Sequence, residues 1–191
     1  PRYLLLSTHG FFLPDAERQT PEEFGHTSSG PRMALLTRPM HRSGLVLAGG
    51  QRVFDGLPIP EGADDGVLTA EEVASIDLFG TKLVVLSACQ PGCGEVRRGE
   101  GVMGLRRAFT TAGAEAVAMS LWKVPDQETA DLTVRLFERY LQTGDAALAL
   151  AQVQREAVQK QRRLGNPWAY SAWHWGASVS YTHLRAHETP E

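Results

Sequence analysis

The sequence has few cysteines, little net charge and no long apolar run, and each shortage excludes a class of protein. Its two cysteines, Cys89 and Cys93, lie four positions apart. They do not form a disulfide framework, so we expect a reducing, cytoplasmic setting. The formal net charge of −3, without a long basic run, argues against nucleic acid as a direct partner. No apolar stretch reaches the length of a membrane span and no secretory signal is recognised, so no membrane partner is expected.

The rest of the composition is typical of a folded globular domain. The chain has 191 residues, 42% of them hydrophobic, which is enough to bury the core of one domain. Short apolar runs predict strands near 3–8, 45–48, 83–88, 116–121 and 173–180. Amphipathic stretches predict helices near 70–79, 102–112, 126–143 and 145–165, and in the third of these we expect Ala130, Val134, Phe137 and Leu141 to face inward. Segments 11–44 and 51–65 are predicted to be loops. This alternation predicts an α/β fold.

A cysteine ends the most apolar of these runs. Five of the six residues from Leu83 to Ala88 are apolar, and Cys89 follows them directly, before a loop that contains glycine and proline. The carboxyl ends of strands in open α/β sheets are where ligands bind, and a thiol held there suits a nucleophile. A buried structural cysteine is the alternative that the pattern leaves open.

A histidine occupies the matching place in the first strand, where the apolar run 3–6 is followed by Ser-Thr-His-Gly. If the two strands are parallel neighbours, His9 and Cys89 face each other although they are 80 positions apart. An imidazole can take the proton of a nearby thiol, and the thiolate is the form that attacks a carbonyl carbon. The backbone N–H groups of Gly10 and Cys89 could then form an oxyanion hole.

Other chemistries fit this sequence less well. Cys89, Cys93 and His9 could be read as zinc ligands, but no second cysteine pair completes a structural site. The C-x-x-C spacing of a redox pair is missing. The glycine-rich segment 92–101 lacks the lysine and the spacing of a phosphate-binding loop. We therefore expect neither a metal nor an organic cofactor.

Taken in order, short motifs along residues 3–180 resemble the CHAT domain, a caspase- and separase-like cysteine peptidase family often fused to tetratricopeptide repeats. They are Ser7–Gly10, Gly44–Ala48, Asp65–Val73, Leu83–Cys89, Gly99–Leu105, Ala112–Ala114 and Ser120–Val124. The resemblance implies a caspase-like three-layer fold, with a mostly parallel central sheet flanked by helices, and a Cys89/His9 dyad. Pro91 and Cys93 depart from the turn that the family commonly has after the nucleophile.

The function that this resemblance implies is that of a thiol protease, a cysteine endopeptidase that cleaves protein or peptide substrates. The resemblance also implies regulation by a tetratricopeptide-repeat or sensor region on the same or a partner chain. Two alternatives stay open. One is a catalytically silent caspase-like scaffold, and the other is a cysteine hydrolase that acts on a non-peptide acyl substrate.

The resemblance further implies that the S1 pocket, which receives the substrate side chain before the scissile bond (P1), includes Trp122, Asp126 and Glu128. This segment is similar to the one in separases whose acidic residues receive a basic P1 side chain. Asp126 is equally placed to cap the next helix, and Lys123 could favour an acidic or neutral side chain instead. The segment therefore leaves a basic, an acidic or a neutral P1 side chain open.

The domain boundaries follow from the same comparison. Residues 1–180 are assigned to one partial CHAT (caspase-like) peptidase domain. Caspase-like domains normally carry strands and a helix before their histidine strand, so the resemblance implies an amino-terminal truncation. Residues 181–191 have no apolar period and are expected to be a non-native or disordered tail.

Overall fold

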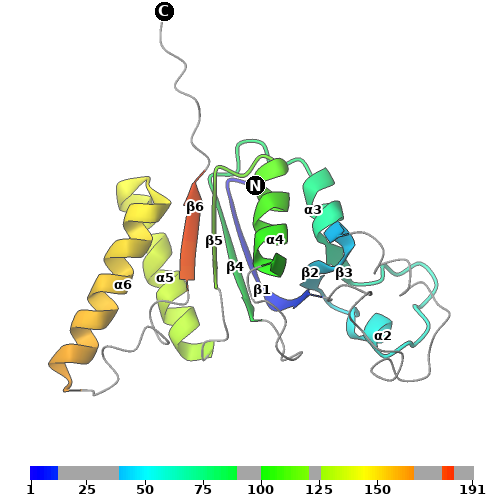
Figure 1. Ribbon diagram of the computed structural model, residues 1–191, viewed down its shortest axis with the longest axis horizontal. Helices are drawn as coiled ribbons and strands as arrows, with labels where there is room; N and C mark the ends of the chain where they lie inside the picture. Colours follow the sequence, from blue (N-terminus) through cyan, green and yellow to red (C-terminus); the bar gives the residue numbers. More distant parts are fainter. Residues whose placement is uncertain (13–38, 90–99, 121–125, 166–177, 183–191) are drawn as a thin grey trace, which may run out of the picture.

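A six-stranded sheet forms the centre of the molecule (Figure 1). The computed structural model describes residues 1–12, 39–89, 100–120, 126–165 and 178–182, and the structural statements below refer to these. The sheet has the strand order β3-β2-β1-β4-β5-β6. Its strands are β1 (Tyr3–Phe12), β2 (Ser43–Val46), β3 (Val67–Thr69), β4 (Leu83–Cys89), β5 (Ala116–Ser120) and β6 (Ser178–Thr182).

Most of these strands run in the same direction. β4 is parallel to both β1 and β5. β2 is antiparallel to β1 and β3 is antiparallel to β2, so β3 again points the same way as β1. Only β2 and β6 are reversed among the described strands, the latter by its antiparallel pairing with β5. The predicted α/β fold with a mostly parallel sheet is confirmed.

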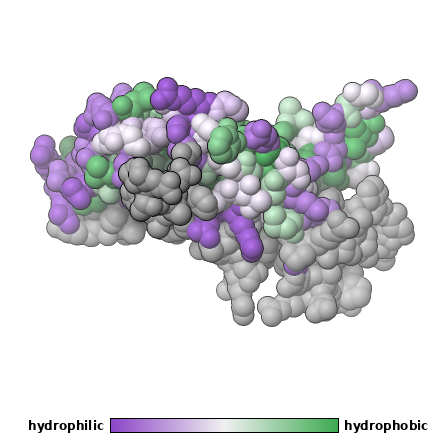
Figure 2. Space-filling model, turned by 90° about the horizontal axis from the view of Figure 1, so that it is seen from above, coloured by the Kyte–Doolittle hydropathy of each residue, from purple (hydrophilic) through white to green (hydrophobic). Residues whose placement is uncertain are grey.

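Helices cover both faces of the sheet and complete three layers (Figure 1). The helices on one face are α3 (Ala70–Ser75) and α4 (Glu100–Thr111), and those on the other are α5 (Asp126–Thr143) and α6 (Ala146–Arg163). The visible surface of α6, at the left of Figure 2, carries many hydrophilic residues. None of the helices in the described ranges combines the length and apolar character needed to cross a membrane.

β4 is buried on both sides, which explains its unbroken apolar sequence. Val84 and Leu86 belong to the core that contains Phe109 of α4. Their neighbours Leu83 and Val85 belong to the second core, which α5 and α6 close. Because successive side chains of a strand leave on opposite faces, one strand contributes to both cores. This double burial fixes the strand that ends at Cys89.

Local chemistry determines several helix ends, although α3 ends at Ser75 and not at the predicted residue 79. The Thr69 hydroxyl accepts from the N–H of Glu72, whose carboxylate accepts from the N–H of Thr69, a complete capping box for α3. Asp145 caps α6 through the N–H groups of Ala147 and Leu148. Gly113, at φ 106°, ends the turn after α4 in a conformation that a side chain would strain.

The predicted inward stripe of α5 is correct only at Phe137, which is partly buried against the second core. Ala130, Val134 and Leu141 are exposed. The buried residues are instead Leu136 and Tyr140, with Leu132 partly buried. Helix α5 carries two overlapping apolar stripes, 130/134/137/141 and 132/136/140, and spacing alone does not choose between them. The choice depends on where α5 lies against the sheet and α6.

Other differences concern short elements and boundaries. A short helix, α2 (Gln51–Phe54), lies inside the predicted loop 51–65, and the three-residue strand β3 was not predicted. β1 continues to Phe12, into the segment predicted as a loop. β6 continues to Thr182, two residues into the segment that the sequence assigned to the tail.

Two arginines of α5 share one carboxylate of α6, and this network predicts a pH-dependent contribution to stability. The Arg135 guanidinium donates to Glu156, and Arg139 Nη2 lies 2.8 Å from Glu156 Oε1. Chiefly because Arg135 donates to it, the pKa of Glu156 lies below its usual value. A lowered folded-state pKa stabilises the protein above the unfolded pKa, and the effect disappears as the pH falls through the folded value.

We therefore expect Glu156→Gln to lower the free energy of unfolding near neutral pH by at most about 1 kcal/mol, because the pair is partly exposed. The difference from the native chain should shrink as the pH falls through the lowered pKa of Glu156. Urea unfolding at neutral and at acidic pH measures it. Glu138→Gln, which removes the same charge from an exposed position of α5, is the control and should change little. An equal loss in both variants would contradict the network's role.

Candidate active site at the carboxyl edge of the sheet

His9 and Cys89 are register partners at the carboxyl edge of the sheet. The parallel ladder of β1 and β4 begins with Tyr3 opposite Leu83 and ends with His9 opposite Cys89. Beyond this pair β1 continues along β2 alone, where Gly10 lies opposite Leu45. The backbone therefore brings two segments 80 positions apart to one place, as the strand patterns predict. The side chain of Cys89 lies outside the described part of the chain.

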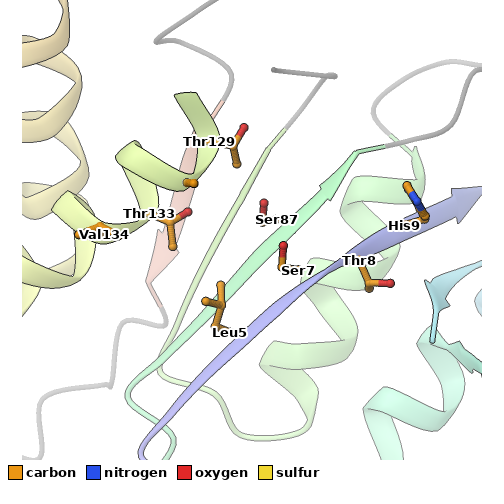
Figure 3. A pocket seen from close by; sticks show the side chains of 9 residues that line it. Leu5, Ser7, Thr8, His9, Ser87, Thr129, Thr133 and Val134 are labelled. Atoms are coloured by element: carbon orange, nitrogen blue, oxygen red, sulfur yellow. The ribbon is translucent and has the colours of Figure 1, made fainter. Parts of the chain in front are cut away.

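The side chain of His9 is exposed at this edge and is not part of either core. The preceding residue, Thr8, points to the other side of β1 (Figure 3), and its hydroxyl donates to the carbonyl of Val46 in β2. Val46 is itself the β2 partner of His9. This hydrogen bond therefore joins β1 to β2 next to His9. The following residue, Gly10, is the predicted oxyanion donor and is buried.

A pocket of about 410 Å³ adjoins His9 on the face of the sheet that α5 covers (Figure 3). We call it the His9 pocket. The strands contribute Leu5, Ser7, Thr8 and His9 from β1 and Ser87 from β4. The helix α5 contributes Thr129, Ala130, Thr133 and Val134. Its size falls in the range of ordinary ligand pockets, so a substrate side chain fits.

The sequence patterns did not reveal this pocket, although part of its signal is visible. Ser7 stands two positions before His9, and Ser87 stands two positions before Cys89. The two serines are register partners. Because side chains alternate along a strand, the strand ends alone would have placed both hydroxyls on one face. The contribution of Val134 could not be found in this way, since the α5 stripe was predicted to face inward.

Several predicted site residues lie outside the described residues. Trp122 is one of them, and although α5 begins at Asp126, the side chains of Asp126 and Glu128 are not described. Cys93, from the zinc alternative, also lies outside the described residues. The proposed S1 residues therefore stay a prediction. In the ranges that the structure describes, no three His, Cys, Asp or Glu side chains come together as metal ligands.

Comparisons with known proteins agree with this architecture. A family model described as the CHAT domain matches residues 1–185. The human (Homo sapiens) tetratricopeptide repeat protein 28 is 34% identical over 122 residues, which are 63% of this chain and 5% of that protein. The mouse (Mus musculus) tetratricopeptide repeat protein 28 is 35% identical over 105 residues, 54% of this chain and 4% of that protein. The chain thus spans about one twentieth of the length of these curated relatives. With nearly its whole length matched by the family model, the chain belongs to the CHAT domain family.

Proposed function

We propose that this domain is a cysteine endopeptidase of the caspase/separase-like type, in which Cys89 is the nucleophile and His9 transfers protons. The observation that carries the proposal is the register pair His9 and Cys89 at the carboxyl edge of two parallel strands. Register partners of neighbouring parallel strands generally carry their side chains on one face, and this rule supports the proposed pairing of the His9 imidazole with the Cys89 thiol. Membership in a peptidase-like family supports the same chemistry.

The proposed reaction is acyl transfer in two halves. His9 takes the proton of the Cys89 thiol, and the sulfur forms a bond to the scissile carbonyl carbon, whose electron pair moves to oxygen. The carbonyl re-forms as the C–N bond breaks, and imidazolium gives its proton to the leaving amine. Water, deprotonated by His9, then attacks the thioester and releases the acid and the free thiol. The N–H groups of Gly10 and Cys89 hold the oxyanion, each worth about 3 kcal/mol in comparable sites.

Control by a repeat region is the second part of the proposal. The curated relatives are named as tetratricopeptide repeat proteins, and the matched part is a small fraction of their length. We propose that a tetratricopeptide-repeat or sensor region, on the same chain or a partner, switches the peptidase on. A conformational step of this kind is a common way to gate a catalytic site.

The experiment compares two forms of the protein on a proteome-derived peptide library. The chain at its natural length, with its activating partner or signal present, is expected to cleave peptides. Residues 1–191 alone are expected to cleave them at least about tenfold more slowly, because the switch is missing. Mass spectrometry of the new termini gives the rates and sites. The Cys89→Ser form of the longer chain is the blank.

Each other outcome identifies an alternative. Equal turnover by both forms would contradict the switch. Peptides left intact while small thioesters are hydrolysed would identify a hydrolase of non-peptide acyl groups. No turnover of either substrate by the folded, stimulated chain would identify a scaffold without catalysis.

A further inference from the structure

The His9 pocket lies where a side chain of the substrate would enter, if the proposed function holds. It extends from His9 along the face of β1 and β4 toward α5 (Figure 3). Ser7 and Ser87, which line it, are register partners two positions before the proposed dyad. A carbonyl held at the dyad would thus have its neighbouring side chain within reach of this pocket.

The described lining of the pocket carries no aspartate, glutamate, lysine or arginine. His9, at the pocket's end, is the one titratable side chain among these residues. A carboxylate, ammonium or guanidinium group taken from water into such a pocket loses hydration and gains no ion pair, which costs several kcal/mol. The described part of the lining therefore offers no ion pair to a charged substrate side chain of either sign.

The same lining offers two favourable contacts to an uncharged side chain. Leu5 and Val134 both line the pocket and are 48% and 59% exposed, so an aliphatic group bound there would cover apolar surface. The hydroxyls of Ser7, Ser87 and Thr133 form no hydrogen bonds with other described residues. They can donate to or accept from an amide or thioether at the end of that side chain.

We propose that the His9 pocket is the subsite for the side chain next to the scissile bond and that it selects a long uncharged one, such as leucine, methionine or glutamine. The pocket residues Leu5, Val134, Ser7, Ser87 and Thr133 then determine specificity. This assignment rests on the proposed peptidase function and deepens it. It differs from the basic preference that Asp126 and Glu128 would give.

The test uses the chain at its natural length and peptidyl acyloxymethyl ketones that differ in one side chain, that next to the reactive group. The side chains compared are leucine, glutamine, arginine and aspartate. We expect Cys89 to be labelled at least about tenfold faster by the leucine and glutamine probes than by the arginine and aspartate probes, the size of effect that pocket contacts give. Intact-protein mass spectrometry follows the labelling.

Two matched variants of α5 test whether the His9 pocket determines which probe labels Cys89 fastest. Val134→Asp places a carboxylate in the pocket, whereas Leu141→Asp makes the same kind of change on α5, outside the pocket and at a similarly exposed position. Both side chains are exposed, so both variants should fold. We expect Val134→Asp to raise the ratio of arginine to leucine labelling at least about tenfold, and Leu141→Asp to leave it unchanged.

Three results would overturn the proposal, and they are distinguishable. Fastest labelling by the arginine probe in the native chain would contradict the uncharged subsite and support the acidic residues at the start of α5. An equal change of the ratio in both variants, or no change in either, would show that the pocket does not select this side chain. Failure of every probe to label Cys89 in the folded chain would remove the proposed peptidase function and the subsite together.

Discussion

Cys89→Ala is expected to abolish cleavage of a protein substrate, by at least about 10³-fold, while the chain stays folded. The proposed mechanism needs a sulfur atom that bonds to the carbonyl carbon, and alanine supplies none. The substitution removes one heavy atom at the carboxyl edge of the sheet, where β4 ends opposite His9. Cleavage rates and circular dichroism of the natural-length chain measure the two effects separately.

The second cysteine supplies the control. Cys93→Ala should retain most of the activity, since the proposed reaction does not use its thiol. If Cys93 proved necessary and Cys89 dispensable, the nucleophile assignment would be wrong, and the metal and redox alternatives set aside above would gain support.

Phe109→Ala is expected to lower the free energy of unfolding by about 3–5 kcal/mol. Phe109 is 1% exposed and lies in the core between α4 and the sheet, with Val84 and Leu86 of the Cys89 strand. The loss combines the transfer of the ring to water with the cavity left behind. Because single domains are stable by only about 5–15 kcal/mol, this loss is a large share of the total. Urea unfolding measures the change.

A second phenylalanine shows whether burial is the cause. Phe79 is 85% exposed in the turn before β4, so Phe79→Ala should change the free energy of unfolding by no more than about 0.5 kcal/mol. Similar losses in the two variants would mean that the two cores described above do not hold the sheet together.

The parts of the fold that the sequence predicts well are those determined by neighbouring residues. The apolar run of β4 and the starts of the helices predicted near 70 and 145 each depend on a few neighbouring positions, and the structure has them. The pairing of His9 with Cys89 was also predictable, because both follow apolar strands and parallel strands end on the same edge.

The parts that it did not predict depend on distant contacts. β3 has three residues and exists through its pairing with β2, so its own pattern is too short to recognise. Leu136 and Val134 belong to competing stripes of α5, and packing against the sheet and α6 decides which one is buried. The lining of the His9 pocket follows in part from that choice, since Val134 is left exposed and lines the pocket together with Leu5.

The central claim is that His9 and Cys89 act as a pair, and the labelling rate of Cys89 in a His9→Ala chain tests it most directly. A peptidyl electrophile is added to the native, His9→Ala and His41→Ala chains, and peptide mapping locates the adduct. His41 is a suitable control because it lies in the short helix η2 (Pro39–His41) against Glu71 of α3, away from the ladder of β1 and β4. We expect the adduct on Cys89, formed about 10²-fold or more slowly without His9 and at the native rate without His41. An adduct on Cys93, or a Cys89 labelled equally fast in all three chains, would contradict the dyad.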